Sequence, residues 1–336
     1  MIDTVPGVST RRRVALACWD YDRTRGLADG RIVPEGVELT YLPLSPEETF
    51  FRMLRHREFD AAELSLSSYV LSLEAERPPF AAIPVFPSRA FRHSGIYVNA
   101  ERGIREPGDL AGGRVGVAEY QLTANVWIRG ILAERHGLEV DSVTYVTGGL
   151  EQPGRIEKLA IELPASVRIE RAPEDRTLSS MLDAGELDAI YSPRAPSTFG
   201  NGRVVRLFAD WPAVEKEYFR ATGIFPIMHV LAIRRELHEE APWIARSLYK
   251  AFDAALAEVR PQLHEVAALK YALPWVAAHA EETEALMGPD PWAYGVEANR
   301  HVLATFLRYS ADQGIARTRR EPESLFVPES LESFAV

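Results

Sequence analysis

Residues 83–99 concentrate side chains that bind anions and transfer protons. The sequence of this stretch, IPVFPSRAFRHSGIYVN, places Arg89, Arg92 and His93 within five positions, between an apolar run and a β-rich run. The planar guanidinium of arginine suits carboxylates, and histidine titrates near neutral pH. Because the chain carries a net charge of −10, a cationic cluster beside apolar sequence is either an ordinary solvated loop or an anion site.

Titratable and aromatic side chains also follow the segments that we expect to be strands. Glu63 lies in the run AAELS, and Glu119 follows the run GRVGVA. An uncompensated carboxylate is costly at such a position, so each should have an Arg or His partner, and either could act as acid or base. Further candidates of this kind are Asp20, Tyr21, Arg23, Ser65, Tyr120, Thr123, Tyr191 and Arg194.

Several of these candidates have structural alternatives. Asp20 suits a base but equally suits a helix cap, and tyrosines at strand ends often serve packing. The paired glycines at 112–113 and 148–149 could bring backbone N–H groups to an anion, although neither pair belongs to a phosphate-binding motif. The eight histidines are scattered, so spacing indicates no metal site. A site assembled in space, for example from His93, His229 and a carboxylate, stays open.

The elements that would position these residues occur twice along the chain. The strings MLRHREFDA at 53–61 and MLDAGELDA at 181–189 share Met, Leu, Glu, Asp and Ala at matching places. In both copies a helical pattern leads into a short apolar strand, and strand and helix patterns alternate upstream. Such alternation predicts parallel strands with right-handed crossovers. We therefore expect an α/β fold of two lobes, each a doubly wound mixed sheet, hinged around a central cleft.

The order of the elements predicts where the lobes begin and end. Residues 98–223 form the second lobe, whereas residues 1–97 and 224–336 form a first lobe that is discontinuous in sequence. This division assumes that a strand over 225–236 and the helical tail beyond it return to the first lobe. Ligands bind beyond the carboxyl ends of parallel strands, so two facing lobes would direct both sets of strand ends into one cleft.

Composition limits the class of partner. A chain of 336 residues with 46% hydrophobic and 26% charged residues is typical of a globular protein. Its acidic balance, without a basic stripe, argues against nucleic acid. No apolar run reaches the ~18 residues of a membrane span, and the run after Arg11, Arg12 and Arg13 is shorter than the ~7–15 apolar residues of an export signal. We therefore expect a cytoplasmic protein that binds a small molecule.

The lone Cys18 excludes an internal disulfide, and the sequence leaves open whether the chain forms a homo-oligomer.

Longer strings carry a family resemblance. The segment IREPGDLAGGRVGVAEY is typical of the start of the second lobe in type II periplasmic-binding-protein folds. The strings WDYDRT, IPVFPSRAFRHSGIYVN, GVAEYQLTANVWIRGIL, GGLEQPGRIEKL and GIFPIMH closely resemble the 4,5-dihydroxyphthalate decarboxylase family, cytoplasmic enzymes of phthalate breakdown that use this fold.

The resemblance implies a carboxy-lyase that removes one carboxylate from a hydroxylated aromatic diacid, converting 4,5-dihydroxyphthalate to 3,4-dihydroxybenzoate and CO₂. A hydroxyl para to the leaving carboxylate pushes electrons to the ring carbon as it loses its proton, and that carbon is then protonated. This chemistry requires no lysine Schiff base, flavin or metal, so no cofactor is expected.

The resemblance also suggests roles for the candidates. The proposed carboxylate clamps are Arg89, Arg92, Arg129, Arg155 and Arg194. His93 is the leading proton donor, with Asp20, Glu63 and Glu119 as the other catalytic candidates. The remaining substrate-binding candidates are Tyr21, Arg23, Ser65, Tyr120, Thr123, Tyr191 and His229, of which His229 is either a cleft or a core residue.

A non-catalytic solute-binding protein for an anionic aromatic compound is the alternative, because the fold alone would predict it. The expected absence of an export signal favours the enzyme. So does the surplus of titratable groups at strand ends, since binding alone needs only the clamps.

Overall fold

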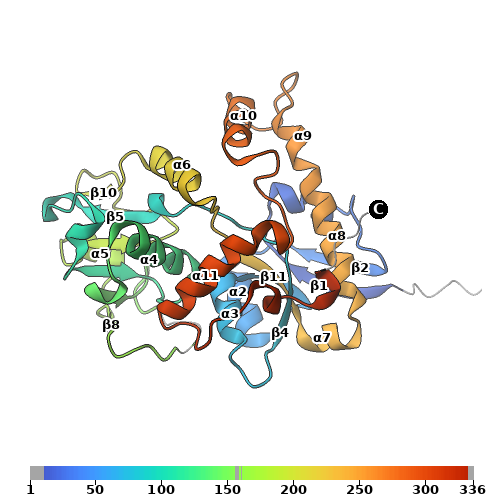
Figure 1. The fold of residues 1–336 in the computed structure, drawn as a ribbon, viewed down its shortest axis with the longest axis horizontal. Helices are drawn as coiled ribbons and strands as arrows, with labels where there is room; N and C mark the ends of the chain where they lie inside the picture. Colours follow the sequence, from blue (N-terminus) through green and yellow to red (C-terminus); the bar gives the residue numbers. More distant parts are fainter. Residues whose placement is uncertain (1–10, 156–158, 160, 332–336) are drawn as a thin grey trace, which may run out of the picture.

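The computed structural model describes residues 11–155, 159 and 161–331, and it contains two β-sheets. The first sheet has the order β2 (Val37–Leu42), β1 (Arg12–Ala17), β3 (Ala61–Ser65), β11 (His229–Arg234), β4 (Phe80–Ile83). The second has the order β10 (Val204–Arg206), β5 (Ile96–Asn99), β9 (Ala189–Tyr191), β6 (Arg114–Val117), β7 (Thr144–Thr147), β8 (Arg168–Arg171). Figure 1 shows the first sheet on the right and the second on the left.

Both sheets are mixed, as expected from the alternating strand and helix patterns. β1 is parallel to β2 and β3, and β6 is parallel to β7 and β9. Each sheet also receives one strand in the opposite direction: β11 pairs with β3 and β4, and β5 pairs with β9 and β10. The predicted α/β fold is therefore confirmed.

Eleven α-helices occur among the described residues, and Figure 1 shows most of them around the two sheets, with α9 and α10 projecting away from them. They are α1 (Arg25–Ala28), α2 (Pro46–His56), α3 (Leu66–Ser72), α4 (Thr123–His136), α5 (Leu178–Asp183), α6 (Trp211–Thr222), α7 (Arg235–Glu240), α8 (Trp243–Ala257), α9 (Val259–Leu263), α10 (Val276–Met287) and α11 (Arg300–Asp312). In both copies of the internal duplication a helix leads into a strand, α2 into β3 and α5 into β9, as the two strings predict.

Local sequence explains the ends of the two helices that matter most for the site. α2 begins after Ser45, whose hydroxyl accepts from the backbone N–H of Glu48, and Pro46 occupies its first turn. α4 ends at Gly137, whose φ of 67° lies in the left-handed region. Both helices start directly after the carboxyl end of a strand region, so their first turns lie at the edges where ligands bind in α/β sheets.

The sheet to which each strand belongs can be compared with the two predicted lobes. The proposed boundary between residues 97 and 98 falls inside β5, which pairs only with strands of the second sheet. The chain returns to the first sheet after Gly223, which ends α6 with a φ of 65°, and β11 begins at His229. We use "first lobe" and "second lobe" below for the two sheets and their flanking helices, as an interpretation of this division.

The C-terminal helices do not all pack on the first lobe. α8 packs on β4 and α1, as expected, but α11 packs against α4 of the second lobe (Figure 1). The rings of Trp127 and Phe306 lie 5.5 Å apart, and Gly130 faces the ring of Tyr309 so closely that an added Cβ would lie 2.1 Å from it. The absence of a side chain at Gly130 is what lets α11 reach the second lobe.

No helix among the described residues is both long enough and apolar enough to cross a membrane.

We predict that Gly130→Ala destabilises the protein, although alanine is the better helix former. The added methyl group would overlap the Tyr309 ring, and overpacking of this kind costs about 1–3 kcal/mol. Thermal unfolding followed by circular dichroism should show a lower midpoint. Gly108→Ala is the control, because an added Cβ there meets no atom within 4 Å. An equal or higher midpoint for Gly130→Ala would contradict the close packing of α4 on α11.

Candidate active site

A buried carboxylate marks the carboxyl edge of the first sheet. Glu63 lies in β3, the central strand, and its residue is 0% exposed. β1 ends beside it at Ala17, followed by Cys18 and Trp19. β11 begins beside it, because His229 pairs with Ser65 in the antiparallel register. Three strands thus direct side chains to the same edge.

Glu63 has hydrogen-bond partners on both carboxylate oxygens. Its Oε1 lies 2.5 Å from His229 Nδ1 and 2.6 Å from the Tyr21 hydroxyl, which donates to it. Its Oε2 accepts from the backbone N–H of Trp19 at 3.1 Å and lies 3.6 Å from Cys18 Sγ. The prediction that Glu63 requires an Arg or His partner is confirmed. The cluster joins groups more than 160 residues apart in sequence.

The electrostatics of this cluster keep Glu63 ionised. Burial alone would raise the pKa of Glu63, but the charge and hydrogen bond of His229 and the Tyr21 hydroxyl hold it below its ordinary value. Burial and the charge of Glu63 raise the pKa of Tyr21, and they raise that of Cys18 well above its usual range. Tyr21 therefore remains a neutral donor, and His229, with Nδ1 turned to Glu63, has Nε2 left for other partners.

A second carboxylate, Glu119, lies at the matching edge of the second sheet. It is buried directly beyond β6, and its Oε1 accepts from Arg155 Nη2 at 2.7 Å and Nε at 3.1 Å. Gln121 Nε2 donates to its other oxygen at 3.1 Å. The predicted basic partner of Glu119 is thus Arg155. These bonds orient Arg155 and leave its Nη1 free of Glu119.

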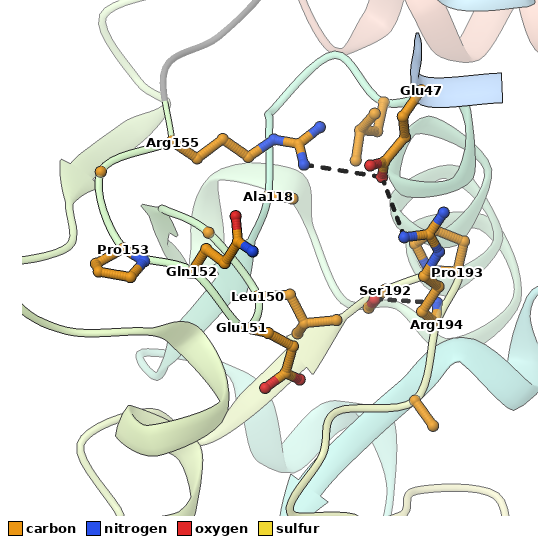
Figure 2. Close-up of a pocket in the computed structure, with 14 residues that line it drawn as sticks. Glu47, Ala118, Leu150, Glu151, Gln152, Pro153, Arg155, Ser192, Pro193 and Arg194 are labelled. Carbon is orange, nitrogen blue, oxygen red and sulfur yellow. Dashed lines mark hydrogen bonds and ion pairs between the residues drawn. The ribbon is translucent and has the colours of Figure 1, made fainter. Parts of the chain in front are cut away.

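A cavity of about 490 Å³ opens beside Arg155 (Figure 2). Its walls are the loop 149–155, the loop 192–195, and parts of 118–122, all from the second lobe, with Glu47 from α2 opposite them. Arg155 and Arg194 both point toward Glu47, with Nη1 to Oε1 separations of 3.8 and 3.7 Å. The volume is within the ~300–1,000 Å³ of small-molecule sites.

A tight loop and one hydrogen-bonded network shape the cavity wall. Gly149 lies where an added Cβ would overlap the carbonyl oxygen of Gln152, so the tight loop requires glycine there. Glu151 accepts from the Ser179 hydroxyl and from the backbone and hydroxyl of Ser197. These bonds join the loops on either side of the cavity. The paired glycines at 148–149 therefore lie at the predicted site edge, whereas those at 112–113 do not line the cavity.

The Glu63 cluster and the cavity are neighbours. The Ser65 and Thr123 hydroxyls lie 2.9 Å apart, and Thr123 also accepts from Ser67 N–H, so β3 meets the first turn of α4. On α2, Phe50 packs edge-on against the His229 ring at 4.9 Å, and Glu47 precedes it by one turn, about 4.5 Å along the axis. The cavity is thus lined from both lobes, whereas Glu63 and His229 do not line it.

The structure separates the predicted arginine clamps into two groups. Arg155 and Arg194 line the cavity. Arg89 instead bonds to the Ala293 carbonyl and the Asn299 side chain, and burial lowers its pKa to about 10. Arg129 is buried, with bonds to the Gln313 side chain and the Tyr120 carbonyl. Arg89 and Arg129 therefore donate to interior groups and do not line the cavity, although Arg89 Nε and Arg129 Nη1 are buried without a hydrogen-bond partner among the described residues. Their role as clamps stays a prediction.

The fifth predicted clamp, Arg92, belongs to neither group. Its Nε contacts Met228 Sδ at 3.0 Å, and burial lowers its pKa to about 10. Within the described part of the chain no carboxylate lies within ion-pair distance of it, and Glu215 is the acidic group whose charge acts on it most. Met228 directly precedes His229. Arg92 is thus a cation near the site without a carboxylate partner of its own.

His93 does not lie with the site residues. Its ring is buried among Phe208, at 5.5 Å, and Tyr218, at 5.1 Å, and burial and His136 lower its pKa to about 4. A histidine with that pKa is neutral at pH 7 and is a poor proton donor. The geometry therefore offers no support for the predicted role of His93 as the proton donor. His229, the other histidine of the prediction, belongs to the Glu63 cluster.

The remaining candidates have mixed positions. Asp20 is exposed and pairs with Arg25 at 2.9 Å, and Arg23 stacks on the Tyr21 ring and pairs with Asp22. Tyr120 and Tyr191 are buried, and neither lines the cavity. No group of three or more His, Cys, Asp or Glu side chains suited to a metal ion occurs among the residues described. His93 and His229 contact different parts of the fold.

Comparison with known proteins identifies the family. The chain is 44% identical over 329 residues to 4,5-dihydroxyphthalate decarboxylase of Comamonas testosteroni, covering 97% of this chain and 100% of that protein. It is 48% identical over 218 residues to the enzyme of the same name from Pseudomonas putida, covering 64% and 84%. The chain belongs to the 4,5-dihydroxyphthalate decarboxylase family. No protein-family model matches it.

Solved structures support the fold of this decarboxylase family member. The periplasmic sulfonate-binding protein SsuA of Methylobacillus flagellatus matches with a TM-score of 0.52 at 13% identity, covering 96% of this chain and 93% of that one. The aliphatic sulphonate binding protein SsuA of Escherichia coli matches with 0.50 at 12%, covering 94% and 97%. The predicted periplasmic-binding-protein-like fold is therefore confirmed.

Glu47 and the cavity wall formed by Glu151 and Gln152 were not predicted from the sequence. Glu47 follows the strand over 37–42 and begins a helix, so the strand-end rule that found Glu63 would have found it too. Glu151 and Gln152 lie in the quoted string GGLEQPGRIEKL, but nothing in their spacing indicated that the loop folds back on Gly149. Residues 156–158 of that string lie outside the described residues.

We predict that Glu63 contributes stability that disappears in acid. Its folded-state pKa is depressed, so its contribution is present above the ordinary value of 4.5 and is lost as the pH falls through the lower folded-state value. Glu63→Gln should lower the free energy of unfolding by about 1.5–3 kcal/mol at pH 7. Unfolding by urea at pH 7, 5 and 3.5 should show the gap between wild type and variant closing below pH 4.5. A gap that stays constant would contradict an ionised Glu63, and Glu48→Gln provides an exposed control.

Proposed function

We propose that this protein decarboxylates 4,5-dihydroxyphthalate to 3,4-dihydroxybenzoate and CO₂, as a carboxy-lyase. The observation that carries the proposal is the 44% identity, across 97% of the chain, to a protein of that name. The site adds groups that the reaction needs: two arginines that line the cavity, and a buried carboxylate–histidine pair at the carboxyl edge of the first sheet, outside the cavity lining.

Binding of the diacid would rest on Arg155 and Arg194. Arg155 is held by Glu119 through Nε and Nη2, and its Nη1 faces the cavity beside Nη1 of Arg194. Two guanidinium groups that converge on one position suit a carboxylate better than ammonium groups would. Arg92 is a further candidate for the second carboxylate.

Proton transfer would rest on His229 and Glu63. The Nδ1–H donates to Glu63, and this bond fixes the tautomer and stabilises the ring when it is charged. His229 Nε2 is then the acid for the ring carbon that loses its carboxylate. This assignment replaces His93, whose buried position and lowered pKa suit packing.

The steps balance with these groups alone. The hydroxyl para to the leaving carboxylate gives up its proton to a carboxylate base, for which exposed Asp20, paired with Arg25, is the candidate. His229 then delivers a proton to the ring carbon, which breaks aromaticity. The carbon–carboxylate bond breaks, its electron pair restores the ring, CO₂ leaves, and the phenolate regains a proton. One proton replaces one carboxylate overall.

Two further expectations accompany this proposal. The partner is a small aromatic carboxylate, and the protein acts in the cytoplasm, as the family resemblance suggests. The competing function is binding of an anionic aromatic compound without turnover, which the fold shared with the sulfonate-binding proteins would also serve.

The proposed reaction is tested with purified protein and 4,5-dihydroxyphthalate. We expect CO₂ and 3,4-dihydroxybenzoate to form in equal amounts, with chromatography used to measure the 3,4-dihydroxybenzoate. Phthalate, which lacks the para hydroxyl, should bind without reacting, because no electron pair can be pushed to the ring carbon. Tight binding of 4,5-dihydroxyphthalate with no product would instead support the binding protein.

We predict that the two histidines respond differently to substitution. His229→Asn keeps an amide that can donate to Glu63 but removes the acid, so kcat should fall by about 10²–10⁴. His93→Phe keeps a ring between Phe208 and Tyr218, and kcat per folded molecule should change by less than about threefold. Steady-state kinetics with circular dichroism as a folding control measure both. A folded His93→Phe enzyme without turnover would restore His93 to the donor role.

A further inference from the structure

Glu47 is the one first-lobe residue among the described residues that line the cavity. It projects from the first turn of α2 toward two arginines of the opposite lobe (Figure 2). Its Oε1 lies 3.8 Å from Arg155 Nη1 and 3.7 Å from Arg194 Nη1. A single carboxylate oxygen therefore lies at the point where both guanidinium groups converge.

The ion pairs of Glu47 with the two arginines are weak enough for a ligand carboxylate to replace them. Both distances exceed those of a charge-assisted hydrogen bond, which are about 2.7–2.9 Å. The side chains of Glu47 and Arg194 are 50% and 64% exposed. Exposed pairs of this kind contribute little to stability. A ligand carboxylate that approaches both arginines at hydrogen-bond distance would replace Glu47 at small cost.

The next residue, Glu48, is also acidic but does not contact the cavity arginines. Glu48, also in the first turn of α2, pairs with Arg52 on its own helix at 2.7 Å. Both acids benefit from the positive end of the helix. Only Glu47 reaches across to the second lobe.

We propose that Glu47 is an internal substitute for a substrate carboxylate. It occupies the position between Arg155 and Arg194 in the ligand-free protein, and a carboxylate of an aromatic diacid displaces it. The residue thereby sets the affinity of the cavity for carboxylates, and its return to the arginines assists release of the bound acid. This proposal rests on the carboxylate-binding role given to Arg155 and Arg194 above.

Displacement has a direct consequence for affinity. Every carboxylate that binds must compete with Glu47, so removal of its charge should tighten binding of carboxylates and leave neutral aromatic compounds unaffected. The size of the change follows from the small strength of exposed ion pairs, which corresponds to about two- to fivefold in a dissociation constant.

The test is calorimetric titration of the full chain with phthalate, which carries both carboxylates and no hydroxyl. Glu47→Gln should lower the dissociation constant by about two- to fivefold, whereas Glu48→Gln, the matched control, should leave it unchanged. Catechol, which has hydroxyls and no carboxylate, should bind wild type and Glu47→Gln equally. Circular dichroism confirms that each variant is folded.

A double-mutant cycle assigns the effect to the arginines. In an Arg194→Ala background, Glu47→Gln should tighten phthalate binding by clearly less than in the wild type, because one of the two cations it competes for is gone. Equal effects in both backgrounds, or phthalate binding that Glu47→Gln leaves unchanged or weakens, would overturn the proposal.

The outcome separates this inference from the proposed reaction. A protein that decarboxylates 4,5-dihydroxyphthalate but shows no effect of Glu47→Gln on phthalate would disprove the role of Glu47 alone. A protein that shows the full cycle but forms no product would keep Glu47 as an internal competitor in a binding protein and would disprove the reaction.

Discussion

The burial of the Glu63 carboxylate is the constraint on which the rest of the site depends. A carboxylate in the central strand of a sheet must be matched by donors, since an unpaired charge there would be far too costly. The donors come from three places: Trp19 N–H after β1, the Tyr21 hydroxyl, and His229 at the start of β11. The antiparallel insertion of β11 beside β3 is what brings His229 to this edge. The fold and the acid–base pair therefore require each other.

A second requirement is that the two lobes face each other in a defined way. Ser65 and Thr123 bond across the lobes, and Trp127 of α4 donates to the Ile227 carbonyl just before β11. α11 packs on α4 through the space left by Gly130. These contacts hold the first turn of α4, and the strand end that precedes it, against the first sheet. Arg155 is oriented from that strand end by Glu119, so the cavity arginines face α2 as a result of packing elsewhere.

Much of the fold was predictable because it depends on local patterns. Alternating strand and helix segments, the repeated string that precedes β3 and β9, and the glycine that ends α4 all have short-range physical causes. The need of Glu63 and Glu119 for basic partners was also predictable, from the cost of burial. Which partner each would have was not, because His229 reaches Glu63 across 166 residues of sequence through β11. Which helices the C-terminal tail would pack against was not predictable, because sequence periodicity shows that a helix has an apolar face but does not show what covers it.

The sequence could not show how His93 and two of the arginines are partnered, and the reason is physical. Spacing shows that cations are close together, but whether they can bind a ligand depends on what their donors already serve. Arg89 and Arg129 donate to backbone carbonyls and amide oxygens of the interior, which are fixed parts of the packed chain. Among the described residues, the Arg194 side chain pairs with the exposed carboxylate of Glu47 at 3.7 Å, which a ligand carboxylate can replace like for like. A cation is therefore available to a substrate when its partner in the free protein is itself an anion that can move away, and this distinction becomes visible only once the chain is folded.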